Sequence, residues 1–132
     1  MYIQNNKEAL AVKQIEILDK AAEIGTKYRD INVNSTFGAA YFYSKDAGNR
    51  LINFDEVIWD YDIDPIIENC RRFGIKEFTI SSTFSSLLTT IALLEKKGCH
   101  MVRLIEINSR YDDWKTGEKE IIPALLMRLD AE

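Results

Sequence analysis

The sequence predicts an α/β domain, with α+β as the alternative class, in which helices pack on a mixed sheet. Three observations lead to this prediction. The segment Ile75–Ile107 has the pattern of a strand, a hydroxyl-rich turn, a helix and a second strand, which is one β-α-β unit. The chain has 132 residues, so residues 1–132 are expected to form a single small domain. Its 46% hydrophobic and 29% charged residues are ordinary for a globular protein.

The N-terminal segment Asn5–Arg29 is expected to form a long amphipathic helix. Its apolar residues recur at the i, i+3, i+4 and i+7 spacing that places them on one helical face. This face would pack on the sheet or, in the alternative interpretation, pair with a second copy of the chain in a homodimer. The apolar positions are Leu10, Ile17, Ala21, Ile24 and Tyr28, with a second row at Ala11, Ile15, Leu18 and Ala22.

The following segment, 31–53, is predicted to be rich in strands. Phe37–Tyr43 is short, aromatic and β-prone, which is typical of a strand. Asp46–Asn49 has the composition of a turn and would close a hairpin onto Leu51–Phe54.

A second helix is predicted over Pro65–Phe73 because both of its ends carry typical signals. Pro65 suits the first helical turn, where a missing N–H costs nothing, and Asp64 is the candidate N-cap. Gly74 suits the left-handed conformation that often ends a helix.

The acidic segment that precedes this helix is a first candidate site. Residues 51–70 contain six acidic residues and no basic one, whereas the whole chain has a net charge of only −4. Alternating carboxylates would share one face of an extended segment and repel one another unless a cation or a basic partner were present. The alternatives are a solvated face, a magnesium site, and a surface for a basic partner that could imitate nucleic-acid phosphates. The candidate partner-binding residues are Asp55, Glu56, Trp59, Asp60, Tyr61, Asp62 and Asp64.

The turn of the central unit is a second candidate site, because α/β folds often bind ligands at such turns. Its hydroxyls would bind an anion at the helix start or, in the simpler interpretation, Ser82 or Thr83 would cap the helix. The single histidine, His100, should lie near the opposite end of the sheet, which disfavours a Ser–His catalytic pair. The candidate anion-binding residues are Ser81, Ser82, Thr83, Ser85 and Ser86.

The segment Asn108–Lys119 is predicted to be a polar loop before a last strand, Glu120–Leu129, in which Pro123 indicates an edge position or a bulge. Gly117 can adopt the positive φ that a turn requires. The loop would be either a hairpin whose Trp114 covers an edge of the core, or a partner-binding loop. Its candidate partner-binding residues are Arg110, Tyr111, Asp112, Asp113 and Trp114.

Composition also limits the redox state, the location and the type of partner that we expect for the protein. Cys70 and Cys99 are expected to be buried free thiols in a reducing compartment, so the fold requires no disulfide or metal. The sequence shows no recognised catalytic set, and no cofactor is expected. The N-terminus lacks the apolar region of a signal peptide, and no apolar run is long enough to cross a membrane, so a cytoplasmic location is expected.

A pI near 5.1 disfavours direct nucleic-acid binding, although a local basic patch is present. The patch comprises Arg71, Arg72 and Lys76.

Three motifs resemble a family of small uncharacterised proteins that phages, plasmids and integrative elements of low-GC Gram-positive gut bacteria carry. The motifs are Val57–Asp60, Ile75–Phe84, and Arg110–Glu118 followed by Ile122–Ala124. The resemblance implies an accessory protein of a mobile element, and such proteins often bind and block host proteins such as CRISPR nucleases or regulators.

We therefore expect a non-enzymatic protein-binding protein that acts through its acidic and aromatic residues, in the manner of an inhibitor of a host defence or regulatory protein. The alternative is an enzyme that binds a small ligand or phosphate at the Ser/Thr-rich turn with Mg²⁺.

Overall fold

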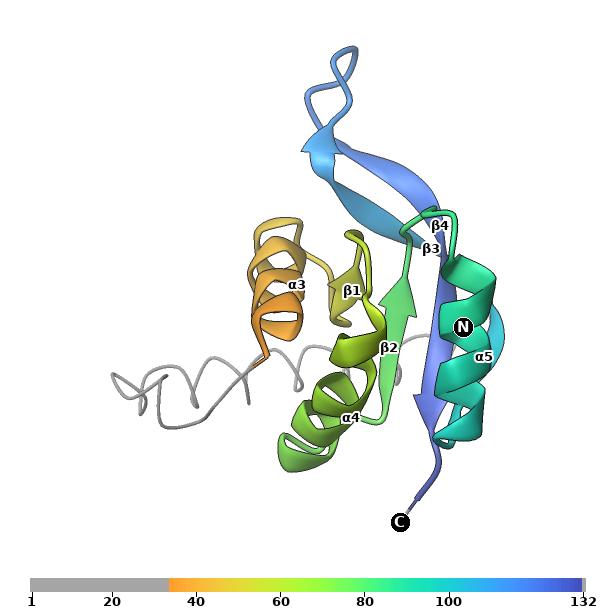
Figure 1. Cartoon of the computed structure of the whole chain (residues 1–132). Coiled ribbons are helices and arrows are strands. Elements are labelled where there is room, and N and C mark those ends of the chain that lie inside the picture. The colour runs from red at the N-terminus through yellow and green to blue at the C-terminus, as the bar shows by residue number, and fades with distance from the viewer. Residues whose placement is uncertain (1–33, 132) are drawn as a thin grey trace.

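Four strands form one mixed sheet in the order β1-β2-β4-β3, and helices lie against it (Figure 1). The computed structural model describes residues 34–131, so the predicted helix Asn5–Arg29 and the homodimer that it would form lie outside the described residues. β1 is parallel to β2, whereas β4 is antiparallel to β2 and β3, which confirms the predicted α/β class. The elements are α3 (Ser35–Asp46), β1 (Asn53–Phe54), the 3₁₀ helix η1 (Asp60–Asp62), α4 (Ile63–Arg72), β2 (Glu77–Ile80), α5 (Leu87–Lys96), β3 (Cys99–Asp112) and β4 (Lys119–Leu129).

The central unit is a split β-α-β arrangement. β2 and β3 are parallel because each is antiparallel to β4, which lies between them. The predicted strand, helix and strand are thus confirmed, but the insertion of the last strand between the other two was not foreseen. β4 pairs with β2 only through Leu125–Arg128. At Pro123 its neighbour among the described strands is therefore β3 alone, in agreement with the predicted edge position.

Helix α3 contradicts the strand that the sequence predicted over Phe37–Tyr43. Asn34 caps the helix, because its side-chain oxygen accepts a hydrogen bond from Phe37 N at 3.0 Å. The buried residues follow the helical i, i+3, i+4 and i+7 spacing. They are Phe37, Ala40, Tyr41 and Ser44. The exposed aromatics Phe42 and Tyr43 interrupt that pattern in the sequence, and tertiary packing overrides their β propensity.

The predicted hairpin between Phe37–Tyr43 and Leu51–Phe54 is also wrong. A turn does follow α3, with Gly48 at a φ of +74°. The chain then forms the two-residue strand β1, which pairs in parallel with β2. The buried Ser44 fixes this return to α3, because its Oγ accepts a hydrogen bond from Asn53 N at 2.7 Å.

Helix α4 confirms the second predicted helix but begins two residues earlier. Pro65 is the third helical residue, and Asp64 lies inside the first turn instead of capping it. Neither position needs an intrahelical N–H partner, which explains why Pro65 is accommodated. The helix ends as predicted, with Gly74 at a φ of +69°.

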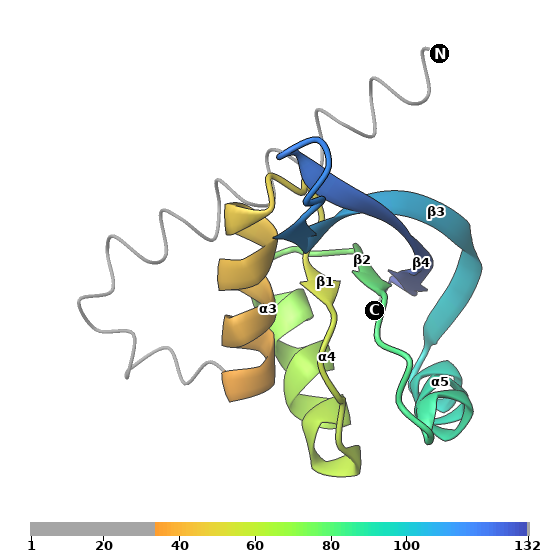
Figure 2. The ribbon, with the colours of Figure 1, turned by 90° about the horizontal axis from the view of Figure 1, so that it is seen from above.

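The core lies between the sheet and the helices. Figure 2 shows α3 beside the β1 edge, with α4 and α5 on one face of the sheet. Phe37 packs on Phe54 at a ring-centroid distance of 6.3 Å, and Phe54 packs on Phe78 at 5.2 Å, so aromatic contacts join α3, β1 and β2. Burying each such side chain contributes about 1.5–3 kcal/mol. None of the helices in residues 34–131 combines the length and apolar character of a membrane span.

Cys70 and Cys99 lie in this core as free thiols, as predicted. Burial raises the pKa of both thiols, and each sulfur is therefore held in its neutral form.

Candidate functional site

The candidate site lies at the carboxyl ends of the two parallel strands, β1 and β2. Residues 55–59 leave β1 there, and residues 81–86 leave β2 beside them. Two backbone hydrogen bonds join the exits, because Ser81 N and Ser82 N both donate to Phe54 O, at 3.0 and 3.3 Å. Ligands commonly bind at this edge of α/β sheets.

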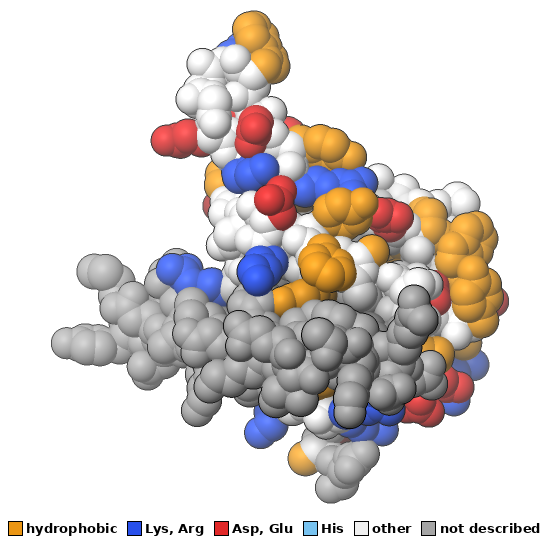
Figure 3. Space-filling view, turned by 90° about the vertical axis from the view of Figure 1, so that its left-hand side faces the viewer, with side chains coloured by type: hydrophobic (Ala, Val, Ile, Leu, Met, Phe, Trp, Pro, Cys, Tyr) orange, Lys and Arg blue, Asp and Glu red, His pale blue; other side chains and the backbone are white. Residues whose placement is uncertain are grey.

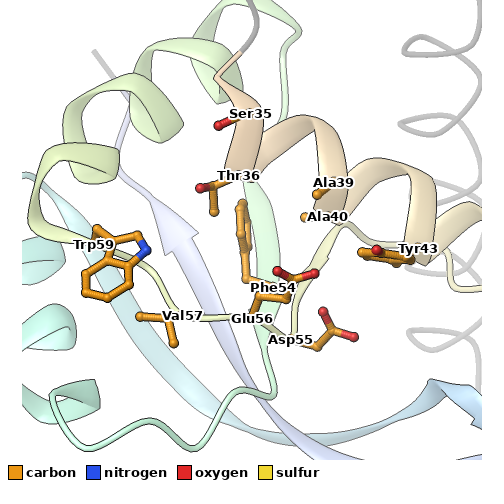
Figure 4. A pocket seen from close by; sticks show the side chains of 10 residues that line it. All are labelled: Ser35, Thr36, Ala39, Ala40, Tyr43, Phe54, Asp55, Glu56, Val57 and Trp59. Carbon is orange, nitrogen blue, oxygen red and sulfur yellow. The ribbon is translucent and has the colours of Figure 1, made fainter.

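Two hollows flank residues 55–59. One is a cavity of about 180 Å³ between α3 and this segment, and its lining includes Tyr43 and Trp59 (Figure 4). The other is a more open groove that residues 55–59 share with residues 82–84 and Arg110. The fold thus brings together side chains from all three segments that the sequence singled out.

Arg110 joins the hairpin to the end of β1. Its Nε lies 3.1 Å from Asp55 Oδ2, an ion-pair distance, although this N–H is not aligned for a hydrogen bond. Its Nη1 donates to Glu56 Oε1 at 3.4 Å. The guanidinium also lies over the Tyr43 ring, 4.0 Å from its centroid, and 5.1 Å from that of Tyr111. Figure 3 shows basic and acidic side chains in contact beneath the protruding hairpin.

Asp55 is the more buried of the two carboxylates in this group. Burial raises its pKa, the Arg110 charge opposes that rise, and the neighbouring Glu56 charge adds to it. The net direction is upward, so Arg110 compensates only part of the cost of placing this carboxylate away from water.

Trp59 and Tyr61 form an exposed aromatic pair. Their rings are nearly parallel, with an interplanar angle of 4° and centroids 6.4 Å apart. Trp59 is 55% exposed and Tyr61 is 74% exposed, and Asp60 between them is exposed as well. Trp59, the N-cap residue of η1, lines the same two hollows as Glu56, which is also exposed.

The predicted arrangement of three carboxylates on one face is wrong, because the segment is helical and not extended. Asp62 is only 1% exposed, and its carboxylate accepts hydrogen bonds from Thr36 Oγ1 at 3.0 Å, Trp59 N at 3.0 Å and Asn34 Nδ2 at 3.2 Å. Asp64 instead forms an ion pair at 3.2 Å with Lys97, the C-cap residue of α5. Asp62 therefore joins η1 to α3 and does not line the surface.

The predicted polar loop is mostly a hairpin, because β3 extends to Asp112 and β4 begins at Lys119. These two residues form an ion pair at 3.2 Å. At the tip, Lys115 N donates to Asp113 Oδ1 at 2.8 Å, and Gly117 has the predicted positive φ, at +73°. Trp114 is 87% exposed, so the prediction that it covers an edge of the core is wrong. Nothing in the local sequence revealed how far this hairpin extends from the sheet (Figure 1).

The serine-rich turn does not cap α5 as predicted. The helix begins only at Leu87, so its N-cap residue is Ser86. The side chain of Ser86 makes no capping hydrogen bond. Ser81 Oγ instead accepts from Asn53 Nδ2 at 2.9 Å, and Ser82 is buried. Thr83, Ser85 and Ser86 are exposed.

Within residues 34–131, no group of three His, Cys, Asp or Glu side chains is placed to hold a metal ion. His100 lies at the start of β3, at the opposite end of the sheet from the serine-rich turn, as predicted. Its Nδ1 lies 2.6 Å from Glu95 Oε2 and its Nε2 lies 2.7 Å from Asp130 Oδ2. Both contacts raise the pKa of the imidazole, that of Glu95 more strongly.

Comparison with known proteins gives one match. Residues 36–129 match the model of a family described as "Domain of unknown function (DUF7698)". No curated protein and no solved structure matches the chain.

Proposed function

We propose that this chain, which belongs to the DUF7698 family, is a cytoplasmic protein-binding protein that recognises a basic surface on its partner. The binding surface consists of Glu56, Trp59, Asp60 and Tyr61, and we call it the acidic–aromatic surface. The observation that carries the proposal is the exposed Trp59–Tyr61 stack, together with the exposed Asp60 that separates the two residues in the sequence.

The chemistry of these side chains suits protein recognition. Tryptophan and tyrosine anchor interfaces because they bury a large area with few rotatable bonds. The stack already holds both rings in one arrangement, so less rotamer freedom is lost on binding. Exposed carboxylates beside them attract a basic partner and discriminate against an acidic one. Asp62, which the sequence also placed among the binding residues, is buried and holds Trp59 in position through the hydrogen bond that it accepts from Trp59 N.

The partner class rests on the resemblance to mobile-element proteins. Accessory proteins of that kind often bind and block host proteins, so a host defence or regulatory protein is the partner that we expect. A CRISPR nuclease is one such protein, and the nucleic-acid-binding surface of a nuclease would supply the basic residues.

Affinity capture tests the proposal. The tagged chain would be incubated with a lysate of a low-GC Gram-positive bacterium at 50, 150 and 400 mM salt. We expect a protein with a basic surface to be retained at the lower salt concentrations and released at the highest, because salt screens exposed charges. Asp60→Lys should abolish its retention. Asp46→Lys makes the same charge change at an exposed position on α3 and should leave retention unchanged. Equal retention by both variants would contradict the proposal.

The alternative function, a small-ligand or phosphate-binding enzyme, has one observation in its favour. Thr83 lines the same open groove as Arg110, so a hydroxyl and a guanidinium lie on one hollow. The carboxylates of Asp55 and Glu56 line that groove too, and they repel an anion. Calorimetry with phosphate and with nucleotides, each in the presence and absence of Mg²⁺, tests this alternative. We expect no heat of binding.

A further inference from the structure

The cavity of about 180 Å³ beside α3 has an apolar floor and a charged rim. Figure 4 shows the ring of Phe54 and the methyl groups of Ala39 and Ala40 between Trp59 on one side and Tyr43 on the other. The side chains of Asp55 and Glu56 lie at the rim, near Phe54. A cavity of this size exceeds the space of one ordered water, which is about 30 Å³, so it can admit a side chain.

The described residues give the cavity a net negative charge. Among residues 34–131 its lining contains Asp55 and Glu56 and includes no lysine or arginine. Arg110, which approaches from the hairpin, contributes one positive charge through its contacts with both carboxylates. One unit of negative charge therefore remains at the rim, and it is complementary to a single cation.

Arg110 also shows what this rim binds. Its guanidinium lies over the Tyr43 ring and contacts both carboxylates. A cation held between an aromatic face and a carboxylate is thus already present at one end of the cavity. At the other end, the Trp59 ring offers a second aromatic surface.

We propose that this cavity binds a lysine side chain of the protein partner, an inference that rests on the proposed function. The aliphatic stem would lie on Phe54 and the alanines of α3, and the ammonium group would contact Glu56. Thr36 Oγ1 can accept a second hydrogen bond from the ammonium, because it donates its own proton to Asp62. An arginine fits less well, since its planar fork requires a paired acceptor, and Arg110 already occupies one oxygen of each carboxylate.

A titration with n-butylammonium chloride, which has the shape and charge of the lysine side chain, tests the inference without any partner. The readout is the indole N–H resonance of Trp59 in the ¹⁵N-labelled full chain. Trp114, on the hairpin tip, is the internal control because it is the second of the two tryptophans and does not line the cavity. Sodium chloride at the same concentrations controls for ionic strength, and n-butanol controls for the apolar stem.

We expect the Trp59 resonance to shift and saturate with butylammonium while that of Trp114 does not move. n-Butanol should bind at least several-fold more weakly. Glu56→Gln, an exposed and nearly isosteric change, should raise the dissociation constant about tenfold, which corresponds to the loss of one charge-assisted contact. Unchanged resonances elsewhere in the spectrum of the variant would show that it is folded.

The inference is overturned if Trp59 does not shift, if n-butanol is as effective, or if Glu56→Gln binds equally well. These outcomes are distinct from failure of the proposed function. A chain that binds butylammonium but captures no basic protein would retain the cavity and lose the proposed function. A chain that captures a partner but does not bind butylammonium would support the proposed function and contradict the lysine-binding cavity.

Discussion

Arg110 Nε lies 3.1 Å from Asp55 Oδ2, and this ion pair joins the base of the hairpin to the end of the short strand β1. Both side chains are mostly buried. The pair therefore fixes the position of the hairpin relative to the acidic–aromatic surface. It also means that the buried charge of Asp55 is compensated by one cation, Arg110.

Arg110→Met should destabilise the fold by about 2 kcal/mol, a value between those of exposed and buried ion pairs, because Asp55 would lose its cation. Urea denaturation measures this change. In an Asp55→Asn background the same substitution should cost clearly less, since no buried charge is then left unpaired. An equal cost in both backgrounds would show that the ion pair contributes no coupling energy.

Asp62→Ala should be one of the most damaging single changes in α4 and its surroundings. The substitution leaves Thr36 Oγ1, Trp59 N and Asn34 Nδ2 without their acceptor, and we expect a loss of about 3 kcal/mol. The matched control is Asp60→Ala two residues earlier, where the carboxylate is exposed and the change should stay within about 0.5 kcal/mol. Thermal melts of the two variants make the comparison, and similar melting temperatures would refute it.

Stability should fall as pH rises above about 6.5 because of His100. Its pKa is raised in the folded state by Glu95 and Asp130, so its protonated form stabilises the fold below the unfolded value of about 6.5. That contribution is lost as pH rises through the folded pKa. Melting temperatures from pH 6 to pH 9 should decline for the native chain and decline less for His100→Gln. His100 is the single histidine, so its ring-proton resonance gives the pKa directly. A value at or below 6.5 would contradict the assignment.

Neither cysteine should react with a thiol reagent in the folded protein. Cys70 and Cys99 are fully buried, so a reagent cannot reach either sulfur. Burial also raises the pKa of both thiols, so neither forms the reactive thiolate. Ellman's reagent should detect no fast-reacting thiol under native conditions and two in denaturant. One fast thiol in the native state would show that the core around α4 and β3 opens readily.

Local pattern determined much of this fold. The strand, helix and strand of residues 75–107 were predictable because their periodicity and flanking residues agree. The end of α4 just before Gly74, the turn at Gly117 and the two free thiols followed from single residues whose chemistry leaves few alternatives. The same reasoning failed for α3, where a helical stripe of buried residues is concealed by exposed aromatics on the other faces.

The candidate site was predictable as a set of residues but not as an arrangement. The sequence identified Arg110 and the acidic segment separately, because unusual density of charge and aromatic residues is visible locally. Their contact depends on the hairpin reaching back over the end of β1, a relationship between residues more than fifty positions apart.

By itself, then, the sequence determined the fold class, the central unit and the residue types available for recognition, since short-range spacing encodes these. Only the tertiary structure decided that β4 separates β2 from β3, that Asp62 is buried while Asp60 is exposed, and that a cavity lies beside Asp55 and Glu56. The physical reason is that burial and long-range pairing depend on which elements meet in space, and no local spacing specifies that.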